Sequence, residues 1–253
     1  MFYLLKNISE VIVIKTKLDK NPDHIMRMFN NISRRYDFFN KLISFNLHNM
    51  TRKKILSNVT SNNDQPIKIV DLACGTGDFL IALRKKFGYK AITIGIDFST
   101  GMLTYSSSKL KKRFSNHSPT LLHQDIGHIP FKENSVHLCT IAYGLRNVID
   151  VLKVLDEIKR ILYPGGVCLI VEASKPKNWL KYYLISFYFK NIVSKIDFFI
   201  SNKFSAYNYL GKSLLEFPDV HQFKKMLQER NWEIISTDSL FLDSVMLICA
   251  KKN

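Results

Sequence analysis

The chain has 253 residues, 46% of them hydrophobic, and a formal net charge of +16. This size suits one large α/β domain with a full core, and no stretch approaches the roughly 18 uninterrupted apolar residues of a membrane-spanning helix. Lysines are spread along the whole chain without a compact arginine-rich block, so we expect no nucleic-acid binding despite the charge.

The N-terminal segment does not resemble a targeting sequence. Its apolar patches at 2–5 and 11–14 are separated by Lys6 and Glu10, and no arginine precedes Arg27. Signal and transit peptides need longer apolar or arginine-rich segments, so we expect a cytoplasmic protein. The four cysteines are far apart and form no Cys-x-x-Cys pair, which indicates reduced core residues and no metal site.

The first predicted elements lead to a glycine-containing turn. Residues 21–58 are predicted to be helical, the apolar run 67–72 predicts a strand, and 79–87 predicts a helix. Between the last two lie Gly75 and Gly77, in the pattern Gly-x-Gly. Glycines at such a turn let the backbone approach a ligand without a Cβ in the way. Polar side chains crowd the same turn, which favours a ligand site over a plain turn: Asp71, Thr76, Asp78 and Asp97.

The next strand, 92–97, ends in Asp97, where an acid can accept hydrogen bonds from a ribose. A dinucleotide site would need a third glycine where Leu80 stands. Asp78 also places a carboxylate where a pyrophosphate needs bare amides. The pattern therefore favours an adenosyl ligand without phosphates, and we expect S-adenosylmethionine.

The rest of the chain continues the alternation of strands and helices, which predicts a mostly parallel seven-stranded sheet with helices on both faces. The expected elements are a helix capped by Ser99 and ending near 112, strands at 120–123, 136–142 and 167–171, a helix at 148–162 closed by Pro164–Gly165–Gly166, a helix at 223–229, and a final antiparallel pair at 234–237 and 245–249. We expect one domain over 1–253.

Two segments stand outside this alternation: an N-terminal helical cap, 21–58, and an insert, 177–216. The insert carries lysines 181, 190 and 195, and it is rich in aromatic side chains: Trp179, Tyr182, Tyr183, Phe187, Tyr188, Phe189, Phe198 and Phe199. A lid that merely packs on the sheet would explain part of this composition. A lid over a hydrophobic ligand, or a face that meets a membrane, fits the rest.

Four further blocks carry a specific resemblance. They are Met28–Asn40, Tyr143–Val148, Glu172–Pro176, and Ser205–Leu210 with Phe217–Pro218. Together with the glycine turn, they resemble the quinone C-methyltransferases of the UbiE/MenG/Coq5 family over residues 24–250. The first block and the Tyr-x-Tyr-Leu run are most similar to the menaquinone branch.

The resemblance implies a Rossmann-like class I methyltransferase fold that transfers a methyl group from S-adenosylmethionine to a ring carbon of a polyprenylated quinol. It favours demethylmenaquinol as substrate, in the last step of menaquinone biosynthesis. Methylation of 2-methoxy-6-polyprenyl-1,4-benzoquinol in the ubiquinone pathway is the alternative. It also implies peripheral association with the inner face of the membrane, and a homodimer is left open.

Site residues carried over by the resemblance form two groups. In the cofactor group, Asp125 is expected to bond the adenine amino group, and Ala142 departs from relatives that often have serine. The full cofactor group is Asp71, Gly75, Thr76, Gly77, Asp97, Asp125, Ile126 and Ala142; the catalytic group is Arg146, Asn147 and Tyr36.

The chemistry assigns roles within the catalytic group. A quinol ring carbon is a weak nucleophile until an adjacent hydroxyl loses its proton, so the site must favour the phenolate. Arg146 is suited to stabilise that oxyanion, while Asn147 and Tyr36 can bond the second oxygen. A salt bridge from Arg146 to Asp150, and core packing of Tyr36, are the structural alternatives. The histidines considered as bases, but expected to be surface or capping groups, are His24, His48, His123 and His128.

Other functions are less consistent with the sequence. Methyltransferases acting on amide or adenine nitrogens usually place Asn/Asp-Pro-Pro-Tyr/Phe after the fourth strand, where this chain has Tyr143–Arg146. No proline is followed by the cysteine that cytosine carbon methylation needs. An RNA or protein methyltransferase therefore ranks lower. A scaffold that binds the cofactor without turnover is the non-enzymatic alternative.

Overall fold

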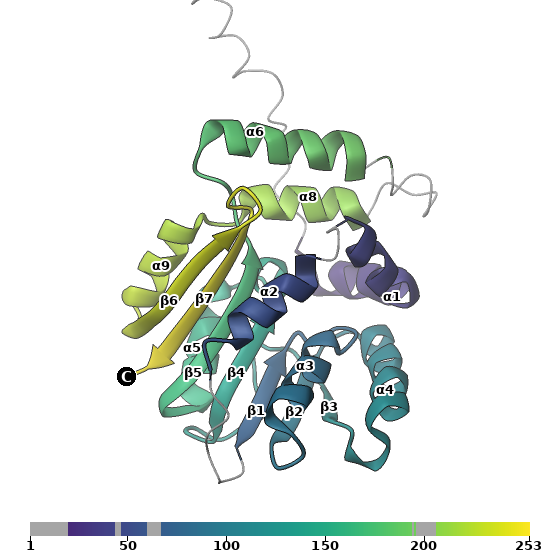
Figure 1. The fold of residues 1–253 in the computed structure, drawn as a ribbon, viewed down its shortest axis with the longest axis vertical. Helices are drawn as coiled ribbons and strands as arrows, with labels where there is room; N and C mark the ends of the chain where they lie inside the picture. Colours follow the sequence, from purple (N-terminus) through teal and green to yellow (C-terminus); the bar gives the residue numbers. More distant parts are fainter. Residues whose placement is uncertain (1–19, 44–46, 60–66, 194, 196–205) are drawn as a thin grey trace, which may run out of the picture.

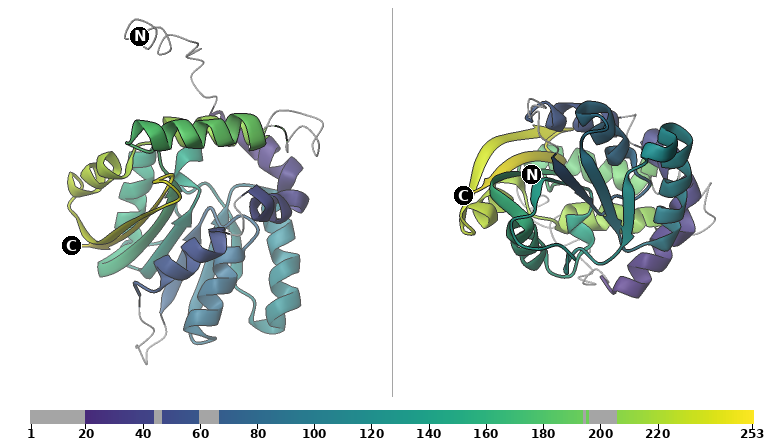
Figure 2. Two further views of the ribbon diagram at one scale, coloured as in Figure 1. Left: turned by 45° about the horizontal axis from the view of Figure 1, so that its top comes forward. Right: turned by 90° about the horizontal axis from the view of Figure 1, so that it is seen from below.

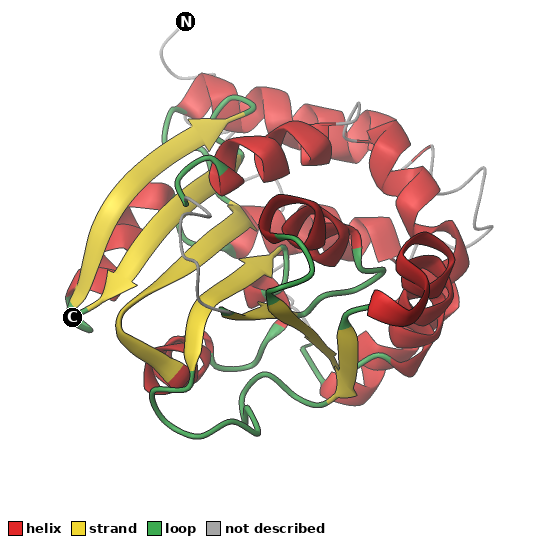
Figure 3. Ribbon diagram, turned by 60° about the horizontal axis from the view of Figure 1, so that its bottom comes forward, coloured by secondary structure: helices red, strands yellow, loops and turns green. Residues whose placement is uncertain are grey.

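A twisted sheet of seven strands forms the centre of the molecule, in the order β3-β2-β1-β4-β5-β7-β6 (Figures 1 and 3). The strands β1 to β5 pair in parallel, and β7 runs antiparallel to both of its neighbours, β5 and β6. This confirms the predicted sheet. Its strands are β1 (Lys68–Leu72), β2 (Ile92–Asp97), β3 (Thr120–His123), β4 (Val136–Ala142), β5 (Leu162–Ala173), β6 (Trp232–Leu240) and β7 (Val245–Lys252).

The computed structural model describes residues 20–43, 47–59, 67–193, 195 and 206–253, without the side chains of 34, 35, 39, 42, 43 and 206–208. The N-terminal apolar patches, Phe198, Phe199 and Ser205 therefore lie outside the described residues. Its helices are α1 (Pro22–Ile43), α2 (Leu47–Leu56), α3 (Asp78–Phe87), α4 (Thr100–Phe114), α5 (Val151–Ile161), α6 (Trp179–Tyr188), α8 (Ala206–Glu216) and α9 (Val220–Gln228), with the short helical turns η1 (Ser115–His117), η2 (Leu145–Asn147) and η3 (Phe189–Val193).

Helices cover both faces of the sheet, as the two largest apolar clusters show (Figure 3). On one face, Ile55 of α2 and Leu83 of α3 are fully buried against the sheet. On the other face, Ile158 of α5 and Phe223 of α9 are fully buried. All four cysteines are buried and free, as predicted.

Side-chain caps fix where helices α4 and α5 begin. The Ser99 hydroxyl accepts from the amide of Met102 at the start of α4, which confirms the predicted cap. The helix predicted from residue 148 begins only at Val151, because the Asp150 carboxylate accepts the amides of Leu152 and Lys153. Residues 145–147 instead form the turn η2, which lies at the carboxyl end of β4.

Pro164–Gly165–Gly166 do not close a helix, contrary to the prediction. Helix α5 ends at Ile161 and β5 begins at Leu162. Leu162 pairs with Val136 while Val167 pairs with Leu138, so residues 163–166 bulge from the strand. Gly165 has a φ of +79°, which glycine adopts without strain. The turn signal is real, but it marks a bulge inside β5.

Helix α1 of the N-terminal cap and the helices of the insert lie over the carboxyl ends of the parallel strands (Figures 1 and 2), whereas α2 of the cap packs on one face of the sheet. The Asn30 side chain of α1 accepts from the Ser99 hydroxyl at 2.7 Å and from the Gly101 amide at 2.9 Å. Val193 of η3 is buried with Met28 of α1 and Leu210 of α8. Within the described residues, every helix is too short or too polar to cross a membrane.

Candidate active site

Two adjoining cavities lie under these helices at the carboxyl ends of the central strands. The Arg146 cavity has a volume of about 450 Å³, and the Asp97 cavity has a volume of about 490 Å³. Five residues line both: Tyr36, Ala73, Gly75, Ala142 and Tyr143. Ligands of open α/β sheets bind at this edge, and the shared wall allows two bound molecules to meet.

The Asp97 carboxylate ends β2 and is 5% exposed. Its Oδ1 accepts from the amide of Ser99 and its Oδ2 from the amide of Gly75, both at 2.8 Å. Burial raises the pKa of Asp97, and the hydrogen bonds from these two amides oppose that effect. Each carboxylate oxygen retains acceptor capacity, so the fixed carboxylate is suited to accept ribose hydroxyls.

The residues around Asp97 fit an adenosyl group. Gly75 has a φ of +53° and lines both cavities, and no atom lies within 4 Å of where its Cβ would be. Ile126, which is 6% exposed, gives the Asp97 cavity an apolar wall. Asp125 lies at its exposed rim, where its Oδ1 accepts from the amide of Gly127 at 2.8 Å. The space, the apolar wall and the carboxylates together suit S-adenosylmethionine.

Gly77 and Thr76, like Asp71, do not line the Asp97 cavity, and Thr76 lines the Arg146 cavity instead. Gly77 lines neither cavity, and a Cβ on it would meet the Ser106 hydroxyl of α4. Its φ of +81° and this contact explain the glycine by packing. The Thr76 hydroxyl donates to Asp37 Oδ1 at 2.5 Å and thereby ties the turn to α1.

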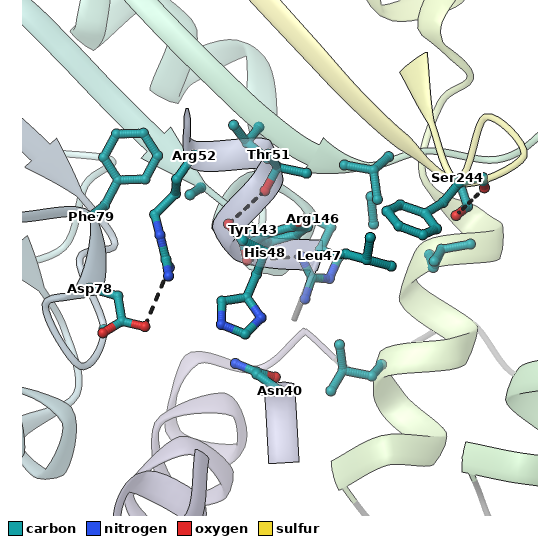
Figure 4. Close-up of a pocket in the computed structure, with 18 of the residues that line it drawn as sticks. Asn40, Leu47, His48, Thr51, Arg52, Asp78, Phe79, Tyr143, Arg146 and Ser244 are labelled. Carbon is teal, nitrogen blue, oxygen red and sulfur yellow. Dashed lines mark hydrogen bonds and ion pairs between the residues drawn. The ribbon is translucent and has the colours of Figure 1, made fainter. Parts of the chain in front are cut away.

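An ion-pair network joins four helices beside the Arg146 cavity. Lys109 of α4 contacts Asp37 of α1 at 2.6 Å and also Asp78 of α3. Arg52 of α2 approaches Asp78 at 3.3 Å (Figure 4). Although burial raises the pKa of Asp78, Lys109 and Arg52 hold it below its ordinary value. The two carboxylates thus neutralise the cations of Lys109 and Arg52 where α1 and α2 meet the glycine turn.

Arg146 is 3% exposed and pairs with Glu172, at the end of β5. Its Nη1 donates to Glu172 Oε1 at 2.6 Å and to the Tyr143 carbonyl at 2.9 Å, and its amide donates to Glu172 Oε2 at 3.1 Å. Burial alone would lower the pKa of Arg146, but the facing Glu172 carboxylate raises it. The ion pair considered from the sequence therefore exists, but with Glu172, because Asp150 caps α5.

Of the other two catalytic candidates, one belongs to the shared wall and one lines only the Asp97 cavity. Tyr36 lines both cavities, and burial raises the pKa of its phenol. Asn147 lines the Asp97 cavity but not the Arg146 cavity, and its Nδ2 donates to the Tyr143 carbonyl at 3.1 Å. Its buried Oδ1 has no partner among the described residues. This placement puts Asn147 at the Asp97 cavity, whereas the sequence argument placed it at the quinol ring.

Two residues of the wall shared by the cavities have strained backbone conformations. Ala73, after β1, and Tyr143, after β4, have φ values of +51° and +57°. Such values are costly for residues other than glycine and persist where the surroundings enforce them, often at functional sites. A Cβ on Gly144 would lie 2.6 Å from the Ala73 Cβ, so the two strand ends approach closely.

Asp71 lies at the base of the Arg146 cavity and is 1% exposed. The Thr140 hydroxyl donates to its Oδ1 at 2.6 Å, and its buried Oδ2 has no partner among the described residues. Burial raises the pKa of Asp71 from 3.8 to about 7, although the Thr140 hydrogen bond opposes this. Asp71 therefore lines the Arg146 cavity and not the Asp97 cavity, unlike the cofactor contact expected from the sequence.

This carboxyl should give the ligand-free protein a pH-dependent stability. Because its folded pKa lies above its unfolded value, the protonated form contributes stability below about pH 4, and that contribution is lost as the pH rises through about 7. The free energy of unfolding of wild type should therefore fall, relative to that of Asp71→Asn, by up to about 1.4 kcal/mol per pH unit over that window. Urea unfolding of both proteins from pH 4 to 8 measures it; parallel curves would contradict the buried, neutral carboxyl.

His48 also lines the Arg146 cavity, which the sequence did not indicate (Figure 4). It is half-buried in the first turn of α2, so the expectation of a surface or capping histidine is wrong for this residue. No motif flags it, because α2 reaches the cavity only through packing of Thr51, Ile55 and Leu56.

Comparison with protein families matches residues 15–249 to the ubiE/COQ5 methyltransferase family. A demethylmenaquinone methyltransferase of Staphylococcus aureus (strain MRSA252) is 34% identical over 84% of this chain and 86% of its own. The protein of that name from strain JH9 is 35% identical over 83% of this chain and 85% of its own.

Solved structures support the fold. A SAM dependent methyltransferase from Aquifex aeolicus matches with a TM-score of 0.57 at 17% identity, over 80% of this chain and 89% of that one. The [4+2]-cyclase SpnF matches with a TM-score of 0.57 at 14% identity, over 79% of each chain. A cyclase among the matches shows that the fold alone does not specify the reaction. The class I methyltransferase fold predicted from the sequence is confirmed.

Proposed function

The chain belongs to the ubiE/COQ5 methyltransferase family, and from that membership we propose that it methylates a ring carbon of demethylmenaquinol, the last step of menaquinone biosynthesis. It is an S-adenosylmethionine-dependent methyltransferase. The observation that carries the choice of substrate is the identity of about a third to demethylmenaquinone methyltransferases over more than four-fifths of both chains.

The Asp97 cavity is the proposed cofactor site. Asp97 would accept the ribose hydroxyls, Ile126 would pack on the adenine, and Asp125 would accept from its amino group. Gly75 and Ala142, which line both cavities, would leave room between cofactor and quinol. Bound S-adenosylmethionine supplies an electrophilic methyl group.

The Arg146 cavity is the proposed quinol site. The guanidinium is buried and held by Glu172, so it presents a fixed positive charge to an oxygen that becomes negative as the hydroxyl ionises. The Tyr36 phenol, on the shared wall, is a second donor, and its raised pKa keeps it protonated. Apolar side chains from the insert and from the β6–β7 turn exclude water: Ile185, Phe189, Leu210, Leu214 and Phe241.

Complementation tests the substrate. The host is a bacterial strain that makes both menaquinone and ubiquinone and from which its own quinone C-methyltransferase has been deleted. We expect expression of this chain to restore menaquinone in the quinone profile. Restoration of ubiquinone alone would favour the benzoquinol alternative, and restoration of neither would contradict both.

A membrane surface is the proposed partner, reached from the cytoplasm. One stripe of α6 exposes large apolar side chains: Trp179, Leu180, Tyr183, Leu184 and Phe187, between 45% and 77% exposed. Helix α6 lies at the outer edge of the molecule, beyond α8 (Figure 1). The exposed Lys177 and Lys190 flank the stripe, whereas Lys181 is paired with Asp243. An apolar stripe flanked by lysines suits the surface of an anionic bilayer.

The Arg146 cavity opens toward this stripe. Among its described lining residues, Leu184 and Leu242 are the exposed ones, at 45% and 46%. Leu184 belongs to α6 and Leu242 to the β6–β7 turn, and the Lys181–Asp243 ion pair joins these two elements at 2.7 Å. A polyprenyl tail leaving between the two leucines would emerge beside the stripe, where a bilayer would hold it.

Vesicle flotation tests the membrane face. We expect binding that strengthens with anionic lipid, because each nearby lysine adds on the order of 1 kcal/mol. The double substitution Trp179→Ser and Phe187→Ser should weaken binding roughly 10- to 100-fold, as buried aromatic area is lost. Tyr163→Ser, which removes a 40% exposed aromatic from the β5 bulge, is the matched control. Equal loss in the control, or no loss in either, would contradict the proposal.

A further inference from the structure

The proposed reaction needs a base that Arg146 does not supply. A quinol hydroxyl must lose its proton before the adjacent ring carbon becomes a strong nucleophile. Arg146 cannot take that proton, because its pKa is raised and the guanidinium stays charged. Burial raises the pKa of Tyr143 to about 12 and also that of Tyr36, so both phenols are donors near neutral pH. The base must come from another group that lines the Arg146 cavity.

His48 is in position for this role. Its imidazole lies in the cavity, on the side where α2 meets the Arg146 and Tyr143 side chains (Figure 4). The helix is fixed by its buried residues Thr51 and Ile55, and the Thr51 hydroxyl donates to the His48 carbonyl at 2.9 Å. A half-buried imidazole on a fixed helix turn can reach a ligand without rearrangement of the fold.

The surroundings favour the neutral imidazole. Burial is the largest cause that lowers the pKa of His48, and the cation of Arg52 lowers it further. Asp78 and Asp37 oppose this, while Lys109 acts with Arg52. The two acids are also paired with the two cations, and burial together with those cations outweighs the pull of the acids on the imidazole. The positive end of the α2 dipole, where His48 lies, acts in the same direction.

We propose that His48 is the general base that takes the hydroxyl proton of the bound quinol. The imidazole nitrogen gains that proton, and the electron pair left on the oxygen, stabilised by Arg146, makes the adjacent ring carbon nucleophilic. That carbon forms the new C–C bond as the methyl–sulfur bond breaks and S-adenosylhomocysteine leaves. The ring carbon then gives its own proton to water, and the oxygen regains the proton held by the imidazole, which restores the aromatic quinol. This role rests on the proposed quinol substrate.

Kinetics of three variants test the role, with a soluble short-chain demethylmenaquinol. We expect His48→Gln to lower kcat about 10²-fold or more, with KM values within a few-fold of wild type. The wild-type profile should lose activity in acid as His48 becomes protonated, and this limb should vanish in the variant. His48→Ala should regain rate with added imidazole. His117→Gln, at an exposed histidine outside both cavities, should leave the rate unchanged.

A second readout does not depend on turnover. A short-chain 4-methoxy-1-naphthol, bound with S-adenosylhomocysteine, changes absorbance when its hydroxyl ionises. We expect ionisation at lower pH on wild type than on His48→Gln. If His48→Gln changes neither the ionisation of the naphthol nor the acid limb of the rate profile, the proposal is overturned. If Asp71→Asn shifts the ionisation and removes the acid limb while His48→Gln does not, the base is Asp71. Failure of wild type to methylate any quinol would refute the proposed function itself.

Discussion

Replacing Arg146 with alanine is expected to lower the rate of methyl transfer to demethylmenaquinol by about 10²–10³-fold, the usual cost of removing one preorganised donor to an oxyanion. Affinity for S-adenosylmethionine should stay within a few-fold of wild type, because Arg146 lines the proposed quinol cavity and not the Asp97 cavity. Single-turnover methyl transfer and calorimetric cofactor binding measure the two effects separately.

The ion pair with Glu172 makes a stability control necessary. Alanine at 146 leaves the fully buried Glu172 carboxylate without its cation, which costs about 3–5 kcal/mol. Arg146→Lys keeps a cation in place and should fold, but it should recover little rate, since an ammonium cannot bond Glu172 and the quinol in the same planar geometry. Arg160→Lys alters a second Arg–Glu pair outside both cavities and should retain full activity. Turnover by Arg146→Lys within a few-fold of wild type would remove the guanidinium from the mechanism.

Asp97→Ala should weaken S-adenosylmethionine binding by about 1–3 kcal/mol, roughly 5- to 150-fold in Kd. Two causes combine, because the carboxylate is the proposed acceptor for the ribose and also fixes the amides of Gly75 and Ser99. Asparagine should not restore binding, since its amide has one acceptor oxygen and would turn a donor toward one of those amides.

Titration calorimetry measures the affinity of Asp97→Ala and of a control variant for the cofactor. Asp238→Ala, at a half-exposed acid paired with Lys54 on the outside of the sheet, should bind the cofactor as wild type does. At saturating cofactor, Asp97→Ala should recover most of its methylation rate, because the residue lies outside the quinol cavity. Wild-type affinity in Asp97→Ala is the result that would remove this residue from the cofactor site.

The sequence predicted the elements whose signals are local. Strands 92–97, 120–123 and 136–142 end where apolar runs end, and Ser99 caps α4 as its hydroxyl suggests. Pro164–Gly165–Gly166 mark a real turn, but turn residues do not distinguish a helix end from a bulge in a strand that the tertiary structure continues.

The site was harder to predict because its contacts join distant segments. Thr76 bonds Asp37, 39 residues away, and Arg146 pairs with Glu172, 26 residues away. A local pattern offered the nearer Asp150 instead. His48 carries no motif and reaches the Arg146 cavity only through the packing of α2. Sequence patterns within one segment therefore predicted the edge of the sheet at which the cavities lie. They did not predict the partners of the cavity residues, because those partners depend on how helices distant in sequence pack together.

The most direct test of the proposed function follows a labelled methyl group. Purified protein is incubated with S-adenosylmethionine carrying a trideuterated methyl group and short-chain demethylmenaquinol under reducing conditions, and the product is analysed by mass spectrometry and NMR. We predict that the product is menaquinol with the CD₃ group on the ring carbon. Arg146→Ala should form this product at least 10²-fold more slowly than wild type. A label on oxygen, or no transfer to the quinol by active, cofactor-binding protein, would contradict the account.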